Sequence, residues 1–211
     1  MTYSSCLSDD LSPLILDTSV LINLHASTHG GRILHALPND ILVPEIVMAE
    51  LEHETSRANG EHQFIQDLVT TGKVQLAVLS ESECEVYATL VSGITSLGDG
   101  EAATIAIASC RRHQPVIDER KGRLQASTHC PGYQPGWSLD LFRHSQVVKA
   151  LGSTESVHTL YLALRDGRMR IHEDHCDHVV GLIGIERALE CNSLPGYKAR
   201  KAEWQTSGLT K

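Results

Sequence analysis

Two short apolar runs in this chain each end in an aspartate, and this pattern constrains the fold more than any other feature. Residues 13–16 precede Asp17, and residues 115–117 precede Asp118. Runs of this kind are typical of buried strands. Further apolar runs predict strands at 41–43 and 74–79. Because segments with helical spacing separate these runs, we expect an α/β domain with a mainly parallel sheet.

Helical patterns follow each predicted strand, so helices should cover both faces of the sheet in a three-layer α/β/α sandwich. Ser80 and Glu83 have the spacing of a capping box at one helix start. The segment 56–60 is a polar break, 92–100 is a loop with two glycines, and 128–136 is a loop rich in Pro and Gly. The expected helices cover residues 18–24, 44–51, 61–70, 80 onward, 101–112 and 119–127.

Helical patterns return in the last third of the chain, at 138–151, 154–164 and 178–189. We therefore divide the chain into a domain at 1–150 and a helical C-terminal extension at 151–211, with a frayed tail after Cys191. The extension has too many Leu, Ile and Val residues for a solvated tail. We expect it to pack on the core or on a second subunit.

Composition excludes several classes of protein. The net charge of -8 argues against a broad basic surface for nucleic acid, although an acidic metal site would contribute to that total. No apolar run approaches the roughly 20 residues of a membrane helix. The first residues lack the pattern of a secretory signal, and the six scattered cysteines resemble reduced thiols. We expect a cytoplasmic protein without a membrane partner.

Carboxylates should converge at one edge of the predicted sheet. Ligands of parallel sheets bind beyond the carboxyl ends of the strands, where Asp17 and Asp118 stand. Glu50 and Glu101 occupy helices beside apolar residues, and Asp99 lies in the loop before Glu101. Taken singly, each acid could be a cap or a solvated position. Together they carry the hypothesis of a shared site.

Such a site needs cations. Two unit charges about 5 Å apart repel by roughly 3 kcal/mol at an effective dielectric near 20. Oxygen ligands without a His or Cys framework suit Mg²⁺ or Mn²⁺ better than zinc. Metal ions held in this way support hydrolysis of phosphodiester bonds.

Four motifs carry a family resemblance. They are LILDTSVLINL at 14–24, LVPEIVMAEL at 42–51, LGDGEAATIAIA at 97–108 and VIDERKGRLQA at 116–126. In this order they resemble the successive motifs of PIN-domain nucleases, over residues 13–150. The GDGEA and DERKGR blocks resemble a VapC-like branch of ribonucleases, in which Gly-Glu-Ala opens the third acidic helix. The last sixty or so residues inherit no function from the resemblance.

The resemblance implies roles for five acids as metal ligands, four of which would also be catalytic. Asp17 matches the first acid of the family, Glu50 the second and Asp118 the last. Glu101 fits the third position through the Gly-Glu-Ala motif, while Asp99 is the alternative or an assisting metal ligand. Which of the two is the main third acid stays open at this point.

Two further residues would bind the substrate. Ser19 matches a hydroxyl that lies beside the first acid in the family, and Arg123 is the best candidate for a contact to phosphate. The neighbouring basic residues are either a small phosphate-binding patch or ordinary solvated helix ends. They are Arg111, Arg112, Arg120 and Lys121.

By this resemblance the chain is a Mg²⁺- or Mn²⁺-dependent endoribonuclease, the toxin of a toxin–antitoxin pair. That role implies RNA as substrate, inhibition by an antitoxin protein and a homodimer. The alternative is a PIN-like module that binds RNA or protein without cleavage. A HAD-type phosphatase would need a second aspartate where Ser19 stands.

One more cluster could bind a metal. On a helix, His172, His175 and Cys176 would share one face, with spacing that could suit a transition metal. A polar helix start is the simpler interpretation of residues 172–178, and we favour it.

Overall fold

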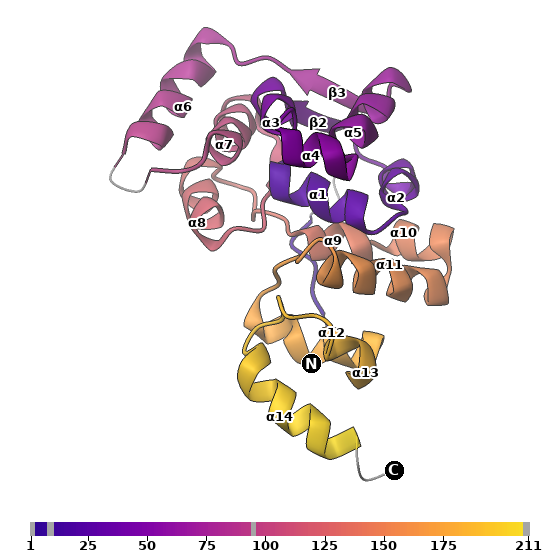
Figure 1. The fold of residues 1–211 in the computed structure, drawn as a ribbon. Helices are drawn as coiled ribbons and strands as arrows, with labels where there is room; N and C mark the ends of the chain where they lie inside the picture. The colour runs from indigo at the N-terminus through magenta and orange to yellow at the C-terminus, as the bar shows by residue number, and fades with distance from the viewer. Residues whose placement is uncertain (1–2, 8–10, 94–95, 209–211) are drawn as a thin grey trace.

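The computed structural model describes residues 3–7, 11–93 and 96–208 (Figure 1). Its centre is a four-stranded parallel sheet in the order β3-β2-β1-β4. The strands are β1 (Leu14–Leu16), β2 (Ile41–Pro44), β3 (Val74–Ala77) and β4 (Gln114–Val116). The predicted α/β class and the parallel sheet are confirmed. A parallel bridge between Val116 and Gly136 extends the sheet beyond β4, within the predicted loop 128–136.

Successive strand residues face opposite layers, which gives the sandwich two hydrophobic clusters. Leu14 and Leu16 of β1 join the larger cluster, while Ile15 joins the smaller one. The larger cluster contains side chains of α1 (Thr18–Ala26), α2 (Gly30–Ala36), α5 (Glu61–Thr70), α9 (Ser138–Arg143), α10 (Ser145–Leu151) and α11 (Ser153–Arg165). The smaller contains those of α6 (Glu81–Ser92), α7 (Asp99–Arg111) and α8 (Arg120–His129). The three-layer prediction is confirmed.

The C-terminal helices lie on the side of the larger cluster, beyond α11 (Figure 1). After a 3₁₀ turn (Glu173–His175) they are α12 (Cys176–Ile183), α13 (Ile185–Ala188) and α14 (Tyr197–Gly208). Leu160, Val179, Leu194 and Trp204 belong to the same buried cluster as Leu14. Within the described ranges, no helix has the length and apolar character needed to cross a membrane.

Several predicted boundaries were wrong. Residues 54–59, partly assigned to a polar break, form α4 (Glu54–Asn59), which ends at Gly60 in the left-handed region at φ 85°. The helix predicted at 178–189 divides at Gly184, where φ is 84°. The tail after Cys191 is not frayed throughout, because α14 buries Trp204.

Two other differences concern the edge of the sheet. β3 ends at Ala77, two residues before the predicted end. α7 begins at Asp99 rather than at Glu101, so both acids stand in the first turn. There the helix dipole favours negative charge. Residues 94–95 of the predicted loop 92–100 lie outside the described residues.

Candidate active site

The carboxyl edge of the sheet holds Asp17 and Asp118, as the pattern predicted. Asp17 follows β1 and caps α1, and its Oδ2 accepts hydrogen bonds from Ser19 Oγ at 2.8 Å and from the Ser19 amide at 3.4 Å. The Asp17 amide donates to the Val116 carbonyl at 3.2 Å, which ties this residue to β4. Both aspartates are 3% exposed. The local fold therefore delivers two carboxylates to one buried edge.

Three donors fix the orientation of Asp118. Ser138 donates from its amide at 2.7 Å and from its hydroxyl at 2.6 Å, and Asn23 Nδ2 donates to Oδ2 at 2.7 Å. Ser138 opens α9, and Asn23 belongs to α1. Neither residue was predicted from the sequence patterns. Asn23 could have been found as a polar residue inside the apolar LINL of the first motif, whereas Ser138 carries no comparable signal.

Glu50, at the end of α3 (Glu45–Glu50), joins α1 to the start of α7. Its Oε2 accepts a hydrogen bond from Thr18 Oγ1, and its Oε1 accepts from the Gly100 amide at 2.8 Å. A Cβ atom on Gly100 would lie 2.6 Å from Glu50 Oε2. This approach explains why a glycine stands between Asp99 and Glu101. Thr18 is a further residue that sequence analysis missed.

The structure separates the roles of Asp99 and Glu101. Asp99 is exposed and accepts a hydrogen bond from Tyr87 Oη at 2.8 Å. Glu101 lies against α8, where a Cβ atom on Gly122 would approach its Oε1 to 2.6 Å. That oxygen is buried and has no hydrogen-bond partner among the described residues. An unpaired buried oxygen is costly, so Glu101 is the better candidate for the third metal-binding acid.

Burial dominates the electrostatics of the site. It raises the pKa of Asp17 and of Asp118 to about 6 and the pKa of Glu101 to about 7. Repulsion by Asp17 raises the pKa of both Glu101 and Asp118, and Glu50 raises that of Asp17. Desolvation is the largest cause of each of these three pKa shifts, ahead of repulsion between the acids. Asp17 therefore interacts electrostatically with each of the other three acids.

The protein offers these acids little positive charge. Within the described ranges, none of the four carboxylates forms an ion pair, although Arg123 and Lys121 lower the pKa of Asp118 and Glu101 from a distance. Carboxylate oxygens and the unpartnered Oε1 of Glu101 suit a hard divalent cation.

No metal cage is preformed in that part of the chain which the structure describes: no three side chains of His, Cys, Asp or Glu converge closely enough to hold an ion. Three of the four acids instead accept hydrogen bonds, from Ser19, Thr18 and Ser138. The carboxylates would have to turn from these donors to share a cation.

For residues 172–178 the structure favours the polar helix start over a transition-metal site, because two of the three candidate ligands have other partners. Cys176 is buried and its thiol points to the Pro195 carbonyl at 3.7 Å. His172 caps the 3₁₀ turn, accepting from the Asp174 amide at 3.3 Å. The segment is a polar helix start.

The two candidates for substrate binding are Ser19 and Arg123. Ser19 stands beside Asp17 through the hydrogen bond given above. Arg123 donates to the carbonyls of Ile117 and Gly136, at 3.2 and 2.6 Å, and its guanidinium lies 3.6 Å from the centre of the Trp137 ring. Much of its hydrogen-bonding capacity is therefore used by the protein itself.

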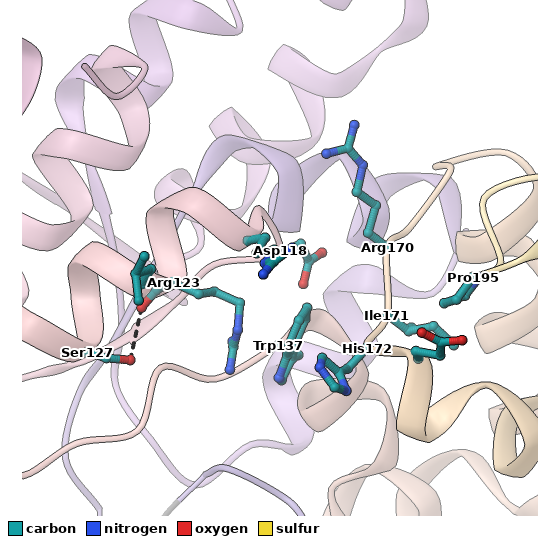
Figure 2. A pocket seen from close by; sticks show the side chains of 11 residues that line it. Asp118, Arg123, Ser127, Trp137, Arg170, Ile171, His172 and Pro195 are labelled. Carbon is teal, nitrogen blue, oxygen red and sulfur yellow. Dashed lines mark hydrogen bonds between the residues drawn. The ribbon is translucent and has the colours of Figure 1, made fainter. Parts of the chain in front are cut away.

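The other basic residues do not form one patch with Arg123. Arg111 is paired with Glu83 at 2.7 Å, and Arg112 caps the same end of α7, far from Glu101 in the first turn. Lys121 donates to the Ser96 carbonyl. Arg120 remains near Arg123, because both line a cavity of about 620 Å³ that also reaches Asp118 (Figure 2).

Comparison with known families gives one match: a model described as PIN domain covers residues 13–132. The matched segment includes all four carboxylates and ends before α9. Comparisons with curated proteins and with solved structures give no match.

Proposed function

This chain belongs to the PIN-domain family, whose model covers more than half of its length, and we propose that it is a metal-dependent endoribonuclease of the VapC-like branch. PIN domains are generally nucleases, so family membership supports a hydrolase in the broad sense. The finer statements, that the substrate is RNA, that a metal ion is required and that the chain belongs to the VapC-like branch, are our proposal.

One observation carries the proposal: carboxylates gather at one edge of the sheet, and within the described ranges none of them forms an ion pair. Asp17 and Asp118 are almost fully buried, and Glu101 Oε1 has no partner in the described ranges. A fold that keeps acids in this state at neutral pH needs protons or cations to offset their charge. The all-oxygen ligand set favours Mg²⁺ or Mn²⁺ over zinc.

In this proposal Asp17, Glu50, Glu101 and Asp118 hold the cations. When bound, such ions activate water and stabilise the oxygen that leaves phosphorus. Asn23 and Ser138 keep Asp118 oriented, a role in which loss of a supporting hydrogen bond typically lowers metal affinity or activity 10- to 100-fold.

The bond changes are those of a hydrolysis. The oxygen of water bonds to phosphorus, the bond from phosphorus to the leaving ribose oxygen breaks, and that oxygen takes up a proton. The Ser19 hydroxyl, beside Asp17, is suited to a hydrogen bond with a phosphate oxygen.

Cleavage of total RNA tests the proposal. The wild type should cut RNA with Mg²⁺ or Mn²⁺ and stop when a chelator is added, and Asp17→Asn should remove the activity. Asp40→Asn is the matched control, because Asp40 is exposed and precedes β2, at the opposite edge of the sheet from Asp17. RNA that stays intact with both metals would leave the alternative, a PIN-like module that binds without cleavage.

The toxin role, with an antitoxin protein and a homodimer as partners, is also a proposal. It rests on the VapC-like motifs. A short reading frame upstream whose product co-purifies with this chain and blocks cleavage would support it. Light scattering that gives a monomer at micromolar concentration would exclude the homodimer.

A further inference from the structure

A cavity joins the acid site to the C-terminal part of the chain. Its volume is about 620 Å³, within the range of pockets that bind small organic molecules. Asp118 lines it on the side of the active site (Figure 2). The opposite wall is made by residues 170–173 and Pro195, which lie beyond the segment that matches the PIN family.

Positive charge gathers around this cavity although the chain as a whole is acidic. Arg120, Arg123 and Arg170 line it and outnumber its two acids, Asp118 and Glu173, in a protein of net charge -8. Arg120 is exposed, and its side chain makes no hydrogen bond or ion pair with the described residues. Arg170 is held by Glu119 in an exposed ion pair. Such pairs contribute at most about 1 kcal/mol, so phosphate can replace Glu119 as the partner of Arg170.

Two aromatic rings meet in the same cavity. Trp137 and His172 lie edge to face, with ring centres 6.1 Å apart, and Figure 2 shows both beside Asp118. Arg123 lies over the Trp137 ring. Trp137 is only half-buried, so part of the ring remains open to a ligand. Aromatic side chains next to arginines are typical of sites where bases of single strands stack while cations contact the backbone.

We propose that this cavity binds a nucleotide of single-stranded RNA next to the bond that is cut, so that the C-terminal extension provides half of the substrate site. The inference rests on the proposed function, because it needs RNA as the substrate. In it, Arg120 and Arg170 contact phosphate, and a base stacks against Trp137 and His172. Asp118 links this subsite to the carboxylates.

A protein segment is the competing occupant. Leu124, 67% exposed, and Ile171 give the cavity some apolar surface. Three arginines around one cavity nevertheless favour a polyanion, and faces of bases also cover apolar surface. RNA is therefore the occupant that the charge favours.

Fluorescence tests the stacking directly, because the chain has only two tryptophans. Trp204→Phe would leave Trp137 as the sole reporter, and Asp17→Asn would prevent cleavage. Addition of a short single-stranded oligoadenylate should quench Trp137. Fluorescence that stays constant while anisotropy of labelled RNA shows saturation would overturn the inference and leave the cavity to a protein partner.

A charge-matched pair of variants gives the second test. Arg170→Ala should weaken RNA binding about tenfold, whereas Arg112→Ala should change it less than about twofold. Arg112→Ala removes the same charge as Arg170→Ala, but at the far end of α7, about 17 Å along the helix from Glu101. Equal effects of the two substitutions would overturn the inference.

These results separate the subsite from the function. If the wild type cleaves RNA with metal but both binding tests fail, the subsite is wrong and the nuclease remains. If quenching and the Arg170 effect are found without cleavage, the subsite stands and the proposed nuclease activity fails.

Discussion

A carboxylate with a buried oxygen lies near each end of α7, and its environment differs between the two ends: Glu83 of α6 has a cationic partner, whereas Glu101 has none. In the last turn, Arg111 binds Glu83 through Nε at 2.7 Å and through Nη2 at 2.9 Å, and this pairing lowers the pKa of Glu83. In the first turn, Glu101 has an unpartnered oxygen, and burial raises its pKa to about 7.

The contrast separates a structural acid from a functional one better than burial does. Glu83 is 2% exposed, as buried as Asp17 or Asp118. What differs is the ion pair: Glu83 is paired with Arg111, whereas the described residues provide no such partner for the acids of the sheet edge. An acid that folding leaves unneutralised is available to a ligand that brings positive charge.

The largest expected effect is on activity. Glu101→Gln should reduce cleavage about 1000-fold, because it removes a metal ligand, while Glu83→Gln should retain activity at temperatures where it is folded. Asp99→Asn should cost less than about threefold, since Asp99 is turned toward Tyr87. Initial rates on a fluorogenic RNA with Mn²⁺ measure all three. A stronger loss in Asp99→Asn than in Glu101→Gln would reverse our assignment of the third acid.

The next largest effect should follow from removing Arg111, the cation that pairs with Glu83. Arg111→Met should lower the free energy of unfolding by about 3 kcal/mol, because it leaves a buried carboxylate unpaired. Adding Glu83→Gln to this variant should restore part of the loss. Urea unfolding measures both. If Arg111→Met is as stable as wild type, the two ends of α7 are not different in the way described.

The pH dependence of stability should differ in sign between Asp17 at the sheet edge and Glu83. Because the pKa of Asp17 is raised to about 6, the folded chain binds that proton more tightly than the unfolded chain. Metal-free protein should therefore lose stability as pH rises from about 4 to about 7. The loss from Asp17 alone is about 2 kcal/mol, allowing for water that enters the edge on ionisation.

Glu83 behaves in the opposite sense. Its pKa is lowered, so its contribution is present above its ordinary pKa and is lost as pH falls through the lowered value. Unfolding in chelator at pH 5 and at pH 8 is the measurement. Asp17→Asn should flatten the fall between these values and Glu83→Gln should not. A wild type more stable at pH 8 than at pH 5 without metal would contradict this expectation.

The smallest effect is stabilisation by metal. Mg²⁺ or Mn²⁺ at ten times its dissociation constant should raise the free energy of unfolding by about 1.4 kcal/mol, since the ion binds the folded state. Thermal melting should show the shift in wild type and in Glu83→Gln but not in Asp118→Asn. A shift that persists in Asp118→Asn would mean that the cation binds elsewhere.

Local patterns predicted the elements that carry the site. Asp17 and Asp118 follow apolar runs, and parallel strands bring their carboxyl ends to one edge whatever the loops do. Ser80 and Glu83 form the predicted capping box. These features depend on residues close together in the chain, which is why the sequence shows them.

Other features depend on distant partners or on exposure. The hydrogen bond from Ser138 to Asp118 requires α9 to return beside β4, and no spacing encodes that return. α4 was missed because it buries no residue, so it has no apolar period. The third metal-binding acid could be chosen only from the structure, because Tyr87 binds Asp99 and Gly122 lies against Glu101.

The hydrophobic cluster that joins Leu14 to Trp204 sets an order of events during synthesis. β1 leaves the ribosome well before side chains that pack in its cluster, such as Leu194, are synthesised. Domains generally fold as units once their chain is available. The sheet edge that holds Asp17 can reach its final packing only after the C-terminal helices have left the ribosome. A ribosome stalled midway would carry the four acids of a nuclease without its finished core.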